Sequence, residues 1–201
     1  ADRLEHAQGM GLVLVVAVGV LWIWRQPVTV TADAGQQETA TLPDGLTVEL
    51  NSGTSLTYHR GFQSWPFVSA DRRAVQLRGE AFFHVEDGSR PFVVQTNTAT
   101  VTVEGTQFNV RARPALDSTT AVTLMEGRVR VAPRDHPARS VTLDQHGETS
   151  RVQFTRATAP TAVDLESVLA WRTNGFAATE EPLIRVLHEL EQRYDTSIRL
   201  H

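Results

Sequence analysis

Apolar and polar residues alternate along most of the chain from residue 28 onward. Successive side chains of a β-strand point to opposite faces, so this alternation predicts strands with one buried face. The segments with this pattern are 28–31, 46–50, 55–58, 75–77, 81–85, 101–103, 108–110, 122–124, 129–131, 141–143 and 152–154. We therefore expect a mainly β domain over residues 28–155.

Glycines separate the halves of several of these patterns. They are Gly79, Gly105, Gly127 and Gly147, at intervals of 26, 22 and 20 residues. A loose repeat of this kind predicts strand pairs that stack in layers. Because the interval varies, we interpret the domain as a twisted β-sandwich or partial β-solenoid and not as a regular β-helix.

The apolar positions change parity around Gly105. Before this glycine the apolar residues are Val101 and Val103, and after it they are Phe108 and Val110. One inserted residue would produce this change. The pattern therefore predicts a β-bulge at Gly105-Thr106 that bends a single strand while both of its halves face the same core.

The N-terminal region carries an apolar run of sixteen residues, 9–24, without a charged side chain. A membrane-spanning helix needs about 17–25 residues, and Trp22, Trp24 and Arg25 form a typical interfacial anchor. We expect a transmembrane helix over residues 9–25, preceded by the remnant of a cytoplasmic segment at residues 1–8. A cleaved signal peptide, with a small-residue site at 32–34, and a buried core helix are the alternatives.

The C-terminal region changes from alternating to helical spacing. Residues 156–172 predict a connector with a short helix at about 165–171. After it, a short strand at 176–178, a helix from Pro182 to Arg193 and a strand at 198–200 predict a small β-α-β unit over residues 173–201.

Composition and motifs argue against most kinds of chemistry. The net charge is −4 and there is no cysteine, which excludes disulfides and thiolate metal sites. The chain lacks a phosphate-binding glycine loop, a nucleophile elbow and a paired-histidine zinc motif. Glu80 follows Gly79 and Glu126 precedes Gly127. We interpret the two carboxylates as caps of exposed amides at these bends, with a carboxylate pair as the alternative. We expect no enzyme, no cofactor and no metal.

The Gly105-Thr106 bond is the exception. A threonine hydroxyl can attack the carbonyl group that precedes it and convert the amide to an ester, which water then cleaves. The sequence makes this bond a candidate for self-cleavage, with an unreactive bulge as the alternative.

Several motifs together resemble one family in order and spacing. They are 31–35 (TADAG), 42–45 (LPDG), 48–51 (VELN), 77–83 (LRGEAFF), 90–94 (RPFVV), 105–110 (GTQFNV) and 122–127 (VTLMEG). This set resembles the FecR-like sigma regulators of bacteria, which are anti-sigma factors. The end of the chain, 171–176, 181–183 and 193–194, is similar to the small N-terminal domain of secretins and TonB-dependent transporters.

The resemblance implies a single-pass protein of the inner membrane with its C-terminal domain in the periplasm. A cytoplasmic N-terminal segment, which is expected to lie outside this sequence, would hold an extracytoplasmic-function sigma factor. The periplasmic part would contact the signalling domain of an outer-membrane TonB-dependent transporter, normally one for iron-siderophore uptake. Nucleic acid is not an expected partner.

The resemblance also implies candidate residues. Gly105 and Thr106 match the Gly-Thr pair at which members of the family are reported to split. The partner-binding candidates on the C-terminal helix are Pro182, Arg185, Glu189 and Arg193.

Two other functions remain open. A membrane-anchored β domain that binds a glycan or cell-wall ligand would need exposed aromatic rings, whereas the alternation expects Phe82, Phe83, Phe92 and Phe108 mostly in the core. An envelope enzyme on a β-solenoid core would need clustered carboxylates, which the sequence does not show.

Overall fold

The computed structural model describes residues 26–60, 62, 72–88, 90–113, 118–173, 175–177 and 183–198. The expected transmembrane helix at 9–25 and the segment 1–8 lie outside these residues. Within the described ranges, no helix has both the length and the apolar character that a membrane crossing requires.

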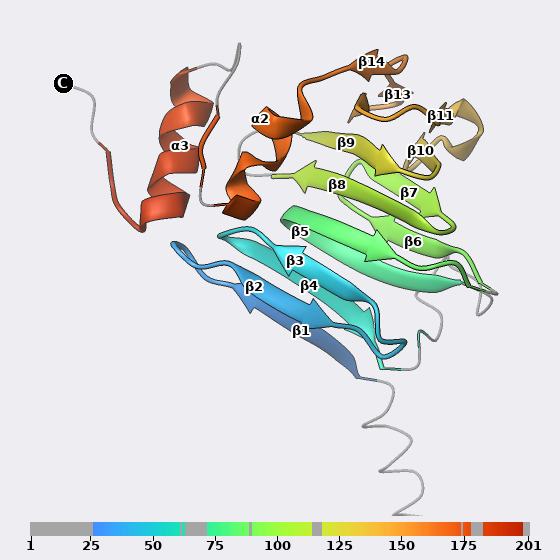
Figure 1. Cartoon of the computed structure of the whole chain (residues 1–201), viewed down its shortest axis with the longest axis horizontal. Helices are drawn as coiled ribbons and strands as arrows, with labels where there is room; N and C mark the ends of the chain where they lie inside the picture. Colours follow the sequence, from blue (N-terminus) through green and yellow to red (C-terminus); the bar gives the residue numbers. More distant parts are fainter. Residues whose placement is uncertain are drawn as a thin grey trace, which may run out of the picture.

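Strands dominate the described chain, as the alternation predicts. They are β1 (Pro27–Ala32), β2 (Glu38–Thr41), β3 (Thr47–Leu50), β4 (Thr54–His59), β5 (Arg73–Val85), β6 (Phe92–Gln95), β7 (Ala99–Val103), β8 (Thr106–Ala112), β9 (Thr119–Glu126), β10 (Val129–Pro133), β11 (Val141–Leu143), β12 (Glu148–Gln153), β13 (Arg156–Ala157) and β14 (Thr161–Ala162). The last two lie in the predicted connector and both pair with β12. Figure 1 shows the strands stacked along the molecule.

The strands form two facing layers. In sheet A the order is β1-β4-β5-β6-β7-β10-β11, and in sheet B it is β2-β3-β5-β8-β9-β12. Strand β5 belongs to both, because residues before Gly79 pair with β4 and β6 while residues from Gly79 onward pair with β3 and β8. All neighbours are antiparallel except β5 and β6. The prediction of a mainly β fold is confirmed, and β5 joins the two layers into one 14-stranded sheet.

The glycines mark the corners at which the chain passes from one sheet to the other. Gly35, Gly53, Gly79, Gly105, Gly127 and Gly147 all lie at such corners and have positive φ angles between 57° and 111°. Strands that change sheets need a sharp local bend, and glycine adopts positive φ without a steric penalty. The glycine repeat in the sequence therefore marks the recurring points at which the chain changes sheets.

The predicted bulge within one strand at Gly105-Thr106 is wrong. Strand β7 ends at Val103 in sheet A, and a new strand begins at Thr106 in sheet B. Turning the corner changes which side of the chain faces inward, and this produces the same parity change as an inserted residue. The actual ladder irregularity lies between Gln107 and Phe108, opposite β9.

The core lies between the two sheets. The apolar residues on both sides of Gly105 are buried, as expected, and the largest fully buried side chains include Phe83, Phe92 and Phe108. The rings of Phe83 and Phe108 stack with centroids 5.1 Å apart. Phe82 is also buried, so these four phenylalanines form no exposed platform for a sugar ring.

The corner glycines should tolerate side chains unequally. We expect Gly79→Ala to lower the free energy of unfolding by about 2–3 kcal/mol, because its φ is +111° and a Cβ there would lie 2.7 Å from Thr54 Cα. The matched control is Gly45→Ala, with φ +87° and no atom within 4 Å of a Cβ, which should cost about 1 kcal/mol. Urea denaturation measures both, and equal losses would contradict the close packing of this corner.

Candidate functional site

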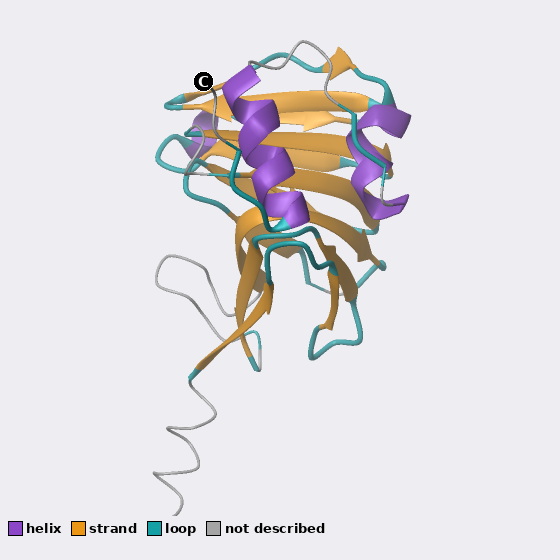
Figure 2. Cartoon of the chain, turned by 90° about the vertical axis from the view of Figure 1, so that its left-hand side faces the viewer, coloured by secondary structure: helices purple, strands orange, loops and turns teal. Residues whose placement is uncertain are grey.

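A C-terminal helical segment covers part of the outer face of sheet B. It contains α2 (Leu165–Leu169), the 3-10 helix η2 (Ala170–Thr173) and α3 (Leu183–Tyr194). Asp164 caps α2 by accepting hydrogen bonds from the backbone N–H groups of Glu166 and Ser167. The Ser167 hydroxyl, with these two N–H groups, holds the pKa of the Asp164 carboxyl below its usual value. Figures 1 and 2 show the helices side by side at one end of the strands.

The 3-10 helix η2 anchors this segment to the sheet. Trp171 is 5% exposed, and its indole Nε1 donates a hydrogen bond to Asn109 Oδ1 at 3.3 Å. The Arg172 guanidinium lies 3.8 Å from the ring centroid of Phe82 and forms two hydrogen bonds with Glu49. These contacts explain why Phe82, on the outer face of sheet B, is buried.

A buried polar cluster lies beside this anchor. The Glu80 carboxylate is 3% exposed and accepts hydrogen bonds from Asn109 Nδ2 at 2.9 Å and Asn51 Nδ2 at 3.0 Å. Its Oε2 also lies 3.4 Å from an Arg113 guanidinium nitrogen. Each carboxylate oxygen therefore has a partner, which a buried charge requires. Both expectations are wrong for Glu80, which is a buried ion-pair residue. Glu126 is exposed and accepts a hydrogen bond from the Gln107 side-chain amide.

Helix α3 makes several polar contacts with the β layers. Glu189 lies 3.9 Å from Arg111 and 4.0 Å from Arg113, and the Gln192 side chain accepts a hydrogen bond from Arg113 at 3.3 Å. The backbone carbonyl of Gln192 accepts from the Gly35 N–H at 2.8 Å. In contrast, the apolar side chains of Leu183, Ile184 and Tyr194 are 62%, 68% and 62% exposed. The helix thus presents apolar side chains to solvent.

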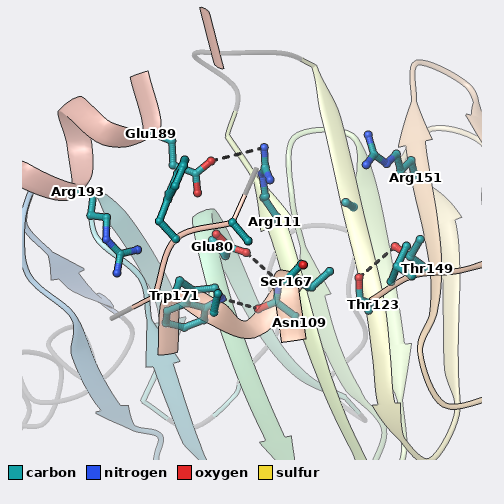
Figure 3. A pocket seen from close by; sticks show the side chains of 17 residues that line it. Glu80, Asn109, Arg111, Thr123, Thr149, Arg151, Ser167, Trp171, Glu189 and Arg193 are labelled. Atoms are coloured by element: carbon teal, nitrogen blue, oxygen red, sulfur yellow. Dashed lines mark hydrogen bonds and ion pairs between the residues drawn. The ribbon is translucent and has the colours of Figure 1, made fainter. Parts of the chain in front are cut away.

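A groove of about 90 Å³ lies between α2, η2, α3 and strands β8, β9 and β12. Figure 3 shows its polar lining. The labelled side chains are Glu80, Asn109, Arg111, Thr123, Thr149, Arg151, Ser167, Trp171, Glu189 and Arg193. Cations, hydroxyl groups and the carboxylates of Glu80 and Glu189 meet there.

The Gly105-Thr106 bond is tightly enclosed at its corner. Thr106 is 2% exposed, and its hydroxyl lies 3.1 Å from the carbonyl oxygen of Glu104 and 3.0 Å from that of Arg128. A Cβ at Gly127 would come within 2.5 Å of the Gly105 carbonyl oxygen, and the Asp87 carboxylate packs against the Gly105 Cα. The Thr106 hydroxyl donates to the carbonyl oxygen of Glu104, which precedes Gly105, so the hydroxyl is turned back toward the Gly105-Thr106 peptide bond.

The described residues contain no group of three or more His, Cys, Asp or Glu side chains placed to hold a metal ion. Arginine and amide groups, which dominate the groove, are poor metal ligands.

Comparison with known proteins decides the family. The family model of the FecR protein matches residues 28–130, just over half of the chain. The chain belongs to the FecR family. No curated protein matches the sequence.

Two crystal structures of a candidate anti-sigma factor from Parabacteroides distasonis ATCC 8503 resemble this FecR protein. The first is 34% identical, with a TM-score of 0.72 over 85% of this chain and 76% of that one. The second is 35% identical, with a TM-score of 0.71 over 84% of this chain and 75% of that one. The likeness therefore extends beyond the residues of the family model and includes C-terminal parts of the chain.

Two of the four partner-binding candidates line the groove of this FecR protein, namely Glu189 and Arg193. Glu189 faces the arginines of sheet B, so it also serves to hold α3. Pro182 lies outside the described residues, and for Arg185 only the helical backbone is described.

The helix of the predicted β-α-β unit is confirmed as α3, but its flanking strands are not found. Phe176 and Ala177 lie in a loop, as does Ile198, while residues 199 and 200 lie outside the described chain. The loop at Phe176 lines the groove instead of joining a sheet.

Sequence reasoning missed the residues that build the groove. Asn109 and Arg111, which line the groove, lie at alternate, outward-facing positions of β8. A run of polar residues on this face is a signal in the sequence, but it is also the ordinary pattern of a solvent-facing strand. The C-terminal helices cover this polar face and make it part of a groove.

Proposed function

We propose that this protein receives a signal in the bacterial periplasm and regulates an extracytoplasmic-function sigma factor. The observation that carries the proposal is membership of the FecR family together with the likeness to the candidate anti-sigma factor over most of the chain. In this proposal residues 9–25 anchor the protein in the inner membrane by a single span. A segment on the cytoplasmic side binds the sigma factor.

The signal would come from the N-terminal signalling domain of an outer-membrane TonB-dependent transporter, of the class that imports iron-siderophores. The exposed apolar residues of α3 support a partner surface at the C-terminal end. An amphipathic helix with a solvent-facing apolar side commonly docks on a partner protein. The candidates Pro182, Arg185, Glu189 and Arg193 belong to this region.

Self-cleavage at Gly105-Thr106 is part of the proposal. The Thr106 hydroxyl oxygen would attack the Gly105 carbonyl carbon, the amide C–N bond would break, and the released amine would keep the hydroxyl proton. Water would then hydrolyse the ester. The enclosed hydroxyl and the close contact of Gly127 support this reaction, because a held nucleophile has a high effective concentration.

A reporter of sigma-dependent transcription tests the role of α3. In cells that contain the parent protein, its sigma factor and its transporter, we expect Leu183→Asp with Ile184→Asp to reduce ligand-induced transcription about tenfold, as loss of a buried interface contact does. The control is Phe154→Asp, which removes an equally exposed ring (75%) in the turn between β12 and β13. Induction that survives the α3 change, or that falls equally in the control, would overturn the proposed surface.

A further inference from the structure

We infer that the groove between α3 and strands β8, β9 and β12 binds an extended acidic segment of a partner protein. We further infer that, while the groove is empty, the Glu189 carboxylate occupies the position beside Arg111 that a carboxylate of the bound segment would take. That the occupant is a protein rests on the proposed function. The recognition chemistry rests on the groove alone.

Positive charge exceeds negative charge in the lining of this groove, which contains three arginines and the carboxylates of Glu80 and Glu189. Figure 3 shows Arg193 and Arg151 on opposite sides with Arg111 between them, and all three line the groove. Of the ion pairs found within the described ranges, only that of Arg111 with Glu189 involves one of these three residues. The chain as a whole carries a net charge of −4, so three arginines around one depression are a local feature. Guanidinium groups favour carboxylates, which they bind through paired hydrogen bonds.

The floor of the groove suits a peptide backbone. The Thr123 hydroxyl donates to Thr149 Oγ1 at 3.0 Å, and Thr149 donates to the carbonyl oxygen of Val122 at 3.0 Å. Both hydroxyl protons are thus committed inside the protein, and the Thr123 oxygen keeps its capacity to accept. An extended segment could donate backbone N–H groups to it while its acidic side chains reach the arginines. Trp171 adds an apolar wall.

Glu189 is an internal carboxylate at this site. Its oxygens lie 3.9 Å from Arg111 and 4.0 Å from Arg113, whereas a charge-assisted hydrogen bond measures about 2.7–2.9 Å. The contact is therefore a loose ion pair. A partner carboxylate that reaches Arg111 at hydrogen-bond distance would replace Glu189. Because Glu189 is one of the residues that connect α3 to the β layers, this replacement would weaken the attachment of the helix and couple binding to helix release.

The binding experiment uses the full 201-residue chain and a fluorescein-labelled peptide of alternating Glu, Gly and Asp. The control peptide carries Gln and Asn at the acidic positions. Anisotropy should show binding of the acidic peptide, weaker at higher salt, and none of the neutral one. Arg151→Gln should weaken binding about fivefold or more.

The matched charge control is Arg78→Gln, an exposed arginine on the outer face of sheet A, which should change the affinity less than about twofold. Absence of acidic-peptide binding, or equal effects of Arg78→Gln and Arg151→Gln, would overturn the inference.

The second variant is Glu189→Gln, which removes the internal competitor with little change in shape. It should tighten binding of the acidic peptide about threefold or more and should speed hydrogen exchange in α3. Weaker or unchanged binding would overturn the role of Glu189. Specific peptide binding in a protein whose α3 variants leave transcription unchanged would uphold the groove and reject the proposed signalling surface. Loss of transcription in the α3 variants without specific peptide binding would reject the groove and uphold the proposed signalling surface.

Discussion

The parent chain should separate under denaturing conditions into two fragments that end at Gly105 and begin at Thr106, and Thr106→Ala should remain a single intact chain. The physical reason is that alanine removes the hydroxyl oxygen that attacks the Gly105 carbonyl carbon. The Thr106 hydroxyl already lies within 3.1 Å of the Glu104 carbonyl, folded back over the bond. Mass spectrometry of the purified protein distinguishes one mass from two.

Two further variants separate chemistry from packing. Thr106→Ser keeps the hydroxyl and should still cleave. Gly127→Ala keeps it too, but its Cβ would press within 2.5 Å of the Gly105 carbonyl oxygen and should slow cleavage by displacing the bond. A parent chain that stays intact through prolonged incubation would show that the corner is unreactive, and the Gly105-Thr106 pair would then be architectural.

Glu80→Leu should lower the free energy of unfolding by about 3 kcal/mol, because it removes the nearer of two carboxylates from the buried Arg113 and leaves Glu189 at 4.0 Å. Arg113 is 7% exposed, and its Nε already lacks a hydrogen-bond partner within the described part of the chain. Asn51 and Asn109 would also lose an acceptor for their side-chain amides. Urea denaturation followed by circular dichroism measures the change.

The matched control is Glu126→Leu, which removes a carboxylate from an exposed position and should cost less than about 0.5 kcal/mol. The double variant Glu80→Leu with Arg113→Leu removes both charges and should be more stable than Glu80→Leu alone. If the double variant lost as much as both single changes combined, the 3.4 Å pair would carry no coupling energy.

The strands and the corners could be predicted from the sequence because both depend on local chemistry. Alternation locates the inward face, and glycine marks positive φ whatever the rest of the fold does. The distinction between a bulge and a corner at Gly105 could not be predicted. Both change the parity of apolar positions, and only the pairing partners of β7 and β8 decide between them.

The groove depends on contacts that sequence spacing does not contain. Asn109 and Trp171 lie 62 positions apart, and Arg172 reaches Glu49 across 123. Glu80 looks like a solvent-facing residue of an alternating strand until this distant segment covers it. The family resemblance could be predicted, since it rests on local motifs with regular spacing, whereas the role of Glu189 needed the helix and the sheet together.

The corner at Gly105 has a mechanical consequence. A break at that bond would leave β1–β7 in one fragment and β8–β14 in the other, yet β5 pairs with β8 over residues 79–85 and β7 pairs with β10 over residues 99–103. The two fragments would stay associated through one hydrogen-bonded strand pair in each sheet. A covalent connection between the two fragments would thus be replaced by hydrogen-bonded strand pairs. These pairs would hold the fragments together without load and would separate under tension between the two ends of the molecule.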